Sequence, residues 1–189
     1  FLMLATMTKK QRTLLRHTDG TSMGARNPND PTKTILPGVP EVMQTSDFNC
    51  IISGFKSPES EKQNFDPDLV ITRFKELMSK LPVQFALFSP AIGGVACYVV
   101  LKQKTGEFEV RKAHEDPRYF AYIGEFKKPG IGMFVVARDI IQEEFGLTVD
   151  AETTTMIGDT WHDEAAAKAF GVPFVHADVV HSHKSLVAG

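Results

Sequence analysis

The clearest helical pattern in the chain lies between residues 65 and 81. Apolar residues recur there at intervals of three and four, which is the spacing of one face of a helix. Asp66 and Pro67 form a helix start, because Asp can cap the first turn and Pro fits the first helical position. The face predicted to point inward carries Val70, Phe74, Leu77, Met78 and Leu81.

Shorter blocks of apolar residues alternate with further helical patterns along the rest of the chain. The pattern predicts strands at 12–15, 50–53, 84–89, 95–101, 154–158 and 172–177, and helices at 37–44, 132–146 and 163–171. The helix at 132–146 should turn Met133, Ala137, Ile140 and Ile141 inward and end at Gly146. Residues 106–126 fit neither pattern. Strands that alternate with helices favour an α/β fold with a mostly parallel, Rossmann-like sheet and helices on both faces.

Length and composition limit the possible classes of protein. The 189 residues are 42% apolar, which suits a single domain over 1–189, with 1–11 and 180–189 expected to be peripheral. A net charge of −2 gives no sign of a general nucleic-acid binder. No apolar run approaches the roughly 20 residues of a membrane span, so we expect a soluble, cytoplasmic protein. Cys50 and Cys97 are too few for a disulfide framework and are expected to be buried thiols.

Polar residues gather where the predicted strands end. Asp19, Ser53 and Lys128 each fall at or just after a strand end or in a nearby loop, and Asp159 and Asp163 follow the strand at 154–158. Ligands of such sheets sit beyond the carboxyl ends of the strands. Carboxylates, a hydroxyl and an ammonium group in one crevice suit a phosphate group together with Mg²⁺, which prefers oxygen ligands.

Four segments, in order, make the chain resemble the haloacid dehalogenase (HAD) superfamily. "HTDGT" (17–21) stands where that family has D-x-D-G-T, and "IIS" (51–53) stands at its strand ending in Ser or Thr. "KKPGIGM" (127–133) matches the lysine motif, and "GDTWHDEAAAKAFGVPF" (158–174) matches the acidic motif closely. The likeness is greatest to members with little or no cap, such as polynucleotide 3′-phosphatases, histidinol phosphatases and heptose bisphosphatases.

The resemblance implies a role for each residue. Asp19 would be a general acid/base and would bind Mg²⁺ through its backbone carbonyl, and Asp159 and Asp163 would be further metal ligands. Ser53 and Lys128 would bind the substrate phosphate, and Lys128 would also be catalytic by neutralising charge on the phosphoryl group during transfer. The family's nucleophile is the first Asp of its first motif, and His17 occupies that place here. Imidazole is a poor ligand for Mg²⁺ beside a lysine. The resemblance therefore implies a Mg²⁺-dependent phosphomonoester hydrolase impaired at position 17.

Several alternatives stay open. A HAD-like domain without catalysis could serve as a binding or structural subunit, and His17 favours that hypothesis. Asp159 could simply cap a helix, Asp163 could complement its dipole, and Asp19 could be a turn residue. A histidine phosphatase would use His17 as nucleophile, but it needs Gly where this chain has Thr18. The substrate could be a small metabolite phosphate or a nucleic-acid 3′-phosphate.

Overall fold

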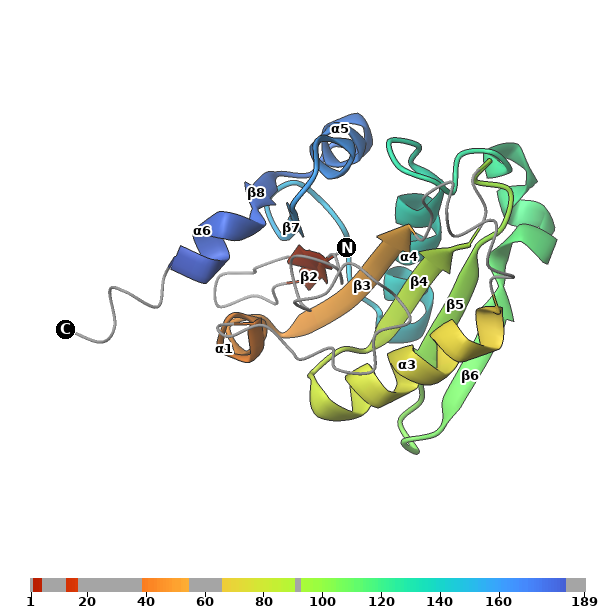
Figure 1. Cartoon of the computed structure of the whole chain (residues 1–189), viewed down its shortest axis with the longest axis horizontal. Coiled ribbons are helices and arrows are strands. Elements are labelled where there is room, and N and C mark those ends of the chain that lie inside the picture. The colour runs from red at the N-terminus through yellow and green to blue at the C-terminus, as the bar shows by residue number, and fades with distance from the viewer. Residues whose placement is uncertain (1, 5–12, 17–38, 55–65, 91–92, 183–189) are drawn as a thin grey trace.

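The computed structural model describes residues 2–4, 13–16, 39–54, 66–90 and 93–182 of the chain. One sheet of eight strands runs through this part, in the order β6-β5-β4-β3-β1-β2-β7-β8 (Figure 1). Its strands are β1 (Leu2–Leu4), β2 (Thr13–Arg16), β3 (Phe48–Gly54), β4 (Phe85–Ser89), β5 (Tyr98–Lys102), β6 (Phe108–Lys112), β7 (Thr154–Gly158) and β8 (Phe174–His176).

The sheet is mixed, and the prediction of a mostly parallel, Rossmann-like sheet is wrong. Five of the nine pairings between described strands are antiparallel: β1 with β2, β3 and β7, and β5 with β4 and β6. The chain between Ser89 and Tyr98 is shorter than the dozen or so residues that a parallel crossover needs, so β5 returns antiparallel to β4. β6, which falls in the region left unassigned from the sequence, extends this meander through a turn at Gly106.

The N-terminal strand also departs from expectation. β1 lies within the segment 1–11 that was expected to be peripheral, yet it pairs with three strands in the middle of the sheet. Leu2–Leu4 are thus part of the sheet itself. Their apolar character fits a short central strand.

Helices cover both faces of the sheet. The elements are α1 (Val39–Gln44), α3 (Pro67–Lys80), α4 (Gly132–Phe145), α5 (Trp161–Phe170) and α6 (Ala177–Ser182). α3 lies in front of the sheet in Figure 1 and α4 behind it. One core cluster joins Ile52 and Leu87 to α4 and α5, and the other joins Ile51 and Phe88 to α1 and α3. Burial of these apolar side chains is the main force that holds the two layers of helices on the sheet.

The two long helices agree with their predicted patterns. The side chain of Asp66 caps α3 by accepting a hydrogen bond from the Asp68 N–H at 2.9 Å. α4 ends at Gly146, whose φ of 67° is a left-handed conformation that glycine adopts without strain. All of the residues predicted to face inward on these two helices are buried.

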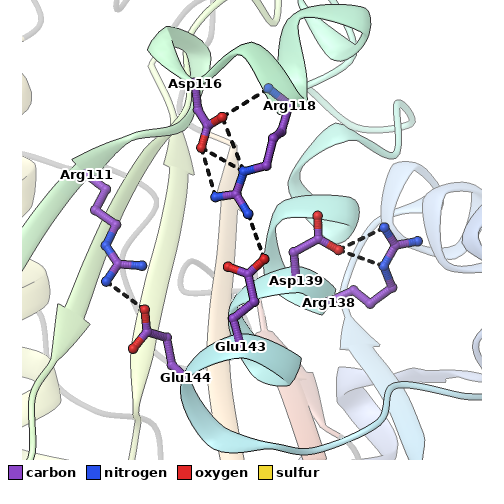
Figure 2. Close-up of polar contacts among 7 residues, drawn as sticks. All are labelled: Arg111, Asp116, Arg118, Arg138, Asp139, Glu143 and Glu144. Carbon is purple, nitrogen blue, oxygen red and sulfur yellow. Dashed lines mark hydrogen bonds and ion pairs between the residues drawn. The ribbon is translucent and has the colours of Figure 1, made fainter.

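Ion pairs fasten the segment after β6 to α4. This segment forms two 3₁₀ helices, η1 (Ala113–Glu115) and η2 (Pro117–Tyr122). Figure 2 shows Arg118 between Asp116 and Glu143, at 2.8 and 2.6 Å, and Arg111 of β6 at 2.7 Å from Glu144 of α4. These pairs are partly exposed to solvent, so each contributes little to stability, but together they fix where this segment lies.

Candidate functional site

The carboxyl ends of three parallel strands lie together at one edge of the sheet. β2 is parallel to both β3 and β7, with Arg16 opposite Ile51 and Leu15 opposite Met156. β2 therefore ends between the ends of its two neighbours. His17 and Asp19, predicted to be catalytic, follow β2 in sequence but lie outside the described residues.

Lys128 and Asp163 form a buried ion pair at this edge. Lys128 Nζ lies 2.9 Å from Asp163 Oδ1, and their side chains are 2% and 0% exposed. Lys128 Nζ also donates a hydrogen bond to the backbone carbonyl of Ile52 at 3.3 Å. Asp163 belongs to the first turn of α5, directly after β7, whereas Ile52 belongs to β3. The lysine thus bridges the ends of the two strands that flank β2.

The other oxygen of Asp163 holds the start of α5. Asp163 Oδ2 accepts hydrogen bonds from the Thr160 N–H at 3.1 Å and the Thr160 hydroxyl at 2.8 Å. The Asp163 N–H also donates to the Thr160 carbonyl at 3.1 Å, and the side chain of each of these two residues contacts the backbone of the other as a capping box. Asp163 Oδ1 has the ion-pair contact with Lys128 and, among the described residues, no well-directed hydrogen bond. Asp163 is consequently oriented by the protein before any ligand binds.

Gly158 makes room for that carboxylate. A Cβ added to Gly158 would lie 2.6 Å from Asp163 Cβ and 2.7 Å from its Oδ2, closer than nonbonded atoms approach. The glycine that precedes Asp159 is therefore required by the close packing of α5 on the end of β7. The sequence signal for this contact is the "GD" at the start of the acidic motif, but its role becomes clear only in the structure.

Burial controls the charge of Lys128. Desolvation lowers the pKa of its ammonium from 10.5 to about 7, against the opposing effects of Asp163 and, more weakly, Asp159. At neutral pH the lysine is thus close to its titration point. An anion bound beside Nζ would favour the charged form, so the site gains positive charge when negative charge arrives.

The metal prediction fits Asp159 better than Asp163. Asp159 follows the last residue of β7, is half-buried, and is close enough to Lys128 to affect its pKa. Both oxygens of Asp163 already face groups of the protein, which leaves it better suited to orienting Lys128 than to binding Mg²⁺. Within the described residues no group of three or more His, Cys, Asp or Glu side chains forms a metal site. The third predicted ligand, Asp19, lies outside this part of the chain.

Two serines mark the ends of β3 and β4. Ser53, the predicted phosphate ligand, is buried at the end of β3. Because successive side chains of a strand point to opposite faces of the sheet, Ser53 lies on the same face as Ile51, which is the face that α3 covers. Ser89, which sequence reasoning missed, is the last residue of β4 and is 1% exposed. Its Oγ has no hydrogen-bond partner in the described part of the chain, which in a buried hydroxyl costs about 1 to 3 kcal/mol.

The tryptophan of the acidic motif and the two cysteines have ordinary surroundings. Trp161 is 66% exposed and its ring stacks on His162 with 3.8 Å between the ring centroids, so it stands at the surface within the acidic motif. Cys50 and Cys97 are buried as expected, and burial raises the pKa of both thiols. They are poor nucleophiles for that reason. In the described ranges no helix is both long and apolar enough to span a membrane.

Comparisons with known proteins identify no relative of this chain. No protein-family model matches the chain, and neither a curated protein nor a solved structure matches it. The candidate site therefore rests on the residues themselves.

Proposed function

We propose that the protein is a Mg²⁺-dependent phosphohydrolase of HAD type that acts on phosphomonoesters, with chemistry weakened by His17. The observation that carries the proposal is the buried Lys128–Asp163 pair at the strand ends. A buried ion pair is a weak contributor to stability, because desolvation offsets much of its attraction. At the carboxyl ends of the parallel strands β2, β3 and β7, this pair gives the protein a lysine that would become charged when an anion binds beside it.

Each of the described residues would have a different role in such a site. Lys128, charged once an anion lies beside it, would neutralise negative charge on a phosphoryl group, since a cation in a buried site stabilises charge more strongly than water does. Asp163 would position the lysine and the first turn of α5. Mg²⁺, when bound, would supply further positive charge, and Asp159 is the described residue best suited to hold it. By the family resemblance, Asp19 would transfer protons to and from the leaving group and water.

A second candidate is a binding domain without turnover. His17 favours it, because imidazole supplies neither a carboxylate nucleophile nor a good Mg²⁺ ligand at that position. The phosphate group is the shared ligand in both cases. The two candidates differ only in whether the phosphoester bond breaks.

Phosphate release and phosphate binding distinguish the candidates. The wild-type chain and Lys128→Met, whose fold is first verified by circular dichroism and a cooperative melting transition, would be incubated with small phosphomonoesters and 3′-phosphorylated oligonucleotides, with and without Mg²⁺. The variant Lys128→Met/Asp163→Asn, which leaves no buried carboxylate without a counter-ion, takes its place if the single variant is unfolded. Slow, Mg²⁺-dependent release that Lys128→Met abolishes supports the hydrolase. Binding of inorganic phosphate without release, again lost in Lys128→Met, supports the binding domain. Neither release nor binding, or a full response in Lys128→Met, would overturn the proposed site.

A further inference from the structure

The hydroxyl of Ser89, which has no hydrogen-bond partner among the described residues, lies at the same edge of the sheet as Lys128. Ser89 is opposite Gly54 in the parallel pairing of β3 and β4, so it stands at the carboxyl ends of both strands. By alternation along β4 it shares the face of Leu87, which packs with Ile52 against α4. Lys128 comes from the residues just before α4 and donates to the carbonyl of Ile52. Ser89 and Lys128 therefore approach the edge from the same side.

The loop after Ser89 is tied to the segment that carries the lysine. The Gly94 carbonyl accepts hydrogen bonds from the Gly124 N–H at 3.0 Å and the Phe126 N–H at 3.1 Å. A Cβ on Gly94 would lie 2.8 Å from the Lys127 nitrogen, so the two segments are in direct contact. Ser89 is paired with Gly54 across the strands, and a Cβ on Gly54 would meet no atom of the described residues within 4 Å. Among those residues, none fills the position beside Ser89 where a side chain at position 54 would lie.

We propose that Ser89 Oγ donates a hydrogen bond to an oxygen of the phosphate group bound at Lys128. This inference rests on the proposed function and deepens it. A buried hydroxyl without a partner calls for an explanation, and a ligand that supplies the missing acceptor is one. The tetrahedral oxyanion is the matching chemistry, because it offers several acceptor oxygens and its charge fits the lysine. Ser89 then joins Lys128 as a ligand of the phosphate from the face of α4, and Ser53 approaches from the face of α3.

The substitution Ser89→Ala separates binding from stability. Inorganic phosphate would be titrated by calorimetry in Mg²⁺ buffer at pH 7 into the wild-type chain and the variant. We expect the Kd to rise at least about tenfold, which equals about 1.4 kcal/mol. The melting temperature of the ligand-free variant should stay the same or rise, because the hydroxyl removed has no hydrogen-bond partner within the described part of the chain. Ser79→Ala is the matched control, since that hydroxyl is exposed on α3 and bonds the Glu76 carbonyl at 2.6 Å.

The outcomes separate this inference from the proposed function. If the wild-type chain binds phosphate and Lys128→Met does not, but Ser89→Ala binds as tightly as wild type, Ser89 is no phosphate ligand and the function stands. A clear drop in the melting temperature of Ser89→Ala would also overturn the inference, because it would show that the hydroxyl has a structural partner. If the wild-type chain binds no phosphate at millimolar concentration, the inference and the function fail together.

Discussion

Replacing the buried ion pair should change how the stability of the protein depends on pH. The informative variant is Lys128→Met/Asp163→Asn, which removes both charges. Removing the lysine alone would leave a buried carboxylate without its counter-ion, which typically costs about 3 to 5 kcal/mol. That loss of stability would obscure the contribution of Lys128 to the pH dependence. In the double variant the amide oxygen at position 163 can still accept a hydrogen bond from Thr160, so the start of α5 keeps a cap.

The expected effect follows from the pKa of Lys128. Its pKa is 10.5 when exposed, as in the unfolded chain, and about 7 in the fold. Between these pH values the unfolded chain binds more protons than the folded one, so the free energy of unfolding rises with pH. The slope approaches about 1.4 kcal/mol per pH unit, and the gain between pH 7 and pH 10 is about 3.5 kcal/mol. The double variant lacks this contribution.

Urea unfolding at pH 7, 8, 9 and 10, in buffer with EDTA, measures the difference. Groups that the two proteins share cancel when the free energies are subtracted. The wild-type chain should gain stability relative to the double variant at each step of the series. A difference that stays constant within about 0.5 kcal/mol from pH 7 to pH 10 would refute the reasoning, because it would mean that Lys128 titrates as an exposed lysine.

Three further substitutions probe the surroundings of the pair. Gly158→Ala should destabilise the fold by about 1 to 3 kcal/mol in urea unfolding, because its Cβ would overlap Asp163, whereas Gly54→Ala should be nearly neutral; equal effects would contradict the packing argument. Arg118→Ala should cost less than about 1 kcal/mol by the same method, since its ion pairs are exposed, and a loss above about 2 kcal/mol would show that they hold the fold. Millimolar Mg²⁺ should raise the melting temperature of the wild-type chain by mass action but not that of Asp159→Asn, and a chain indifferent to Mg²⁺ would count against the metal site.

Local signals in the sequence were sufficient for most of the helices and strands. The start of α3 could be predicted because a cap and a proline act within a few residues of one another, and the inward faces followed from helical spacing. The direction of the strands could not be predicted in this way. Whether β5 returns antiparallel depends on pairing between distant segments, and β1 looks apolar whether it lies inside the sheet or outside it.

The candidate site could likewise be predicted from the sequence only in part. Lys128 and Asp163 were found from their motifs, but their mutual contact and their burial depend on how α5 packs on β7. Asp163 was expected to bind metal, which stays a prediction, and its contacts with Lys128 and Thr160 could not be foreseen from the motif. Ser89 carries no motif at all. Its significance comes from a missing hydrogen bond, which no sequence pattern records.

The rate at which the His17→Asp variant releases phosphate, compared with that of the wild-type chain, tests the central claim most directly. A carboxylate at position 17 would supply the nucleophile that the family resemblance implies is missing. With Mg²⁺ and a small phosphomonoester, we expect His17→Asp to release phosphate at least about tenfold faster than the wild-type chain, or about 1.4 kcal/mol of barrier. Adding Lys128→Met should abolish the gain. A fully active wild-type chain that His17→Asp slows, or a gain that survives the loss of Lys128, would contradict the account.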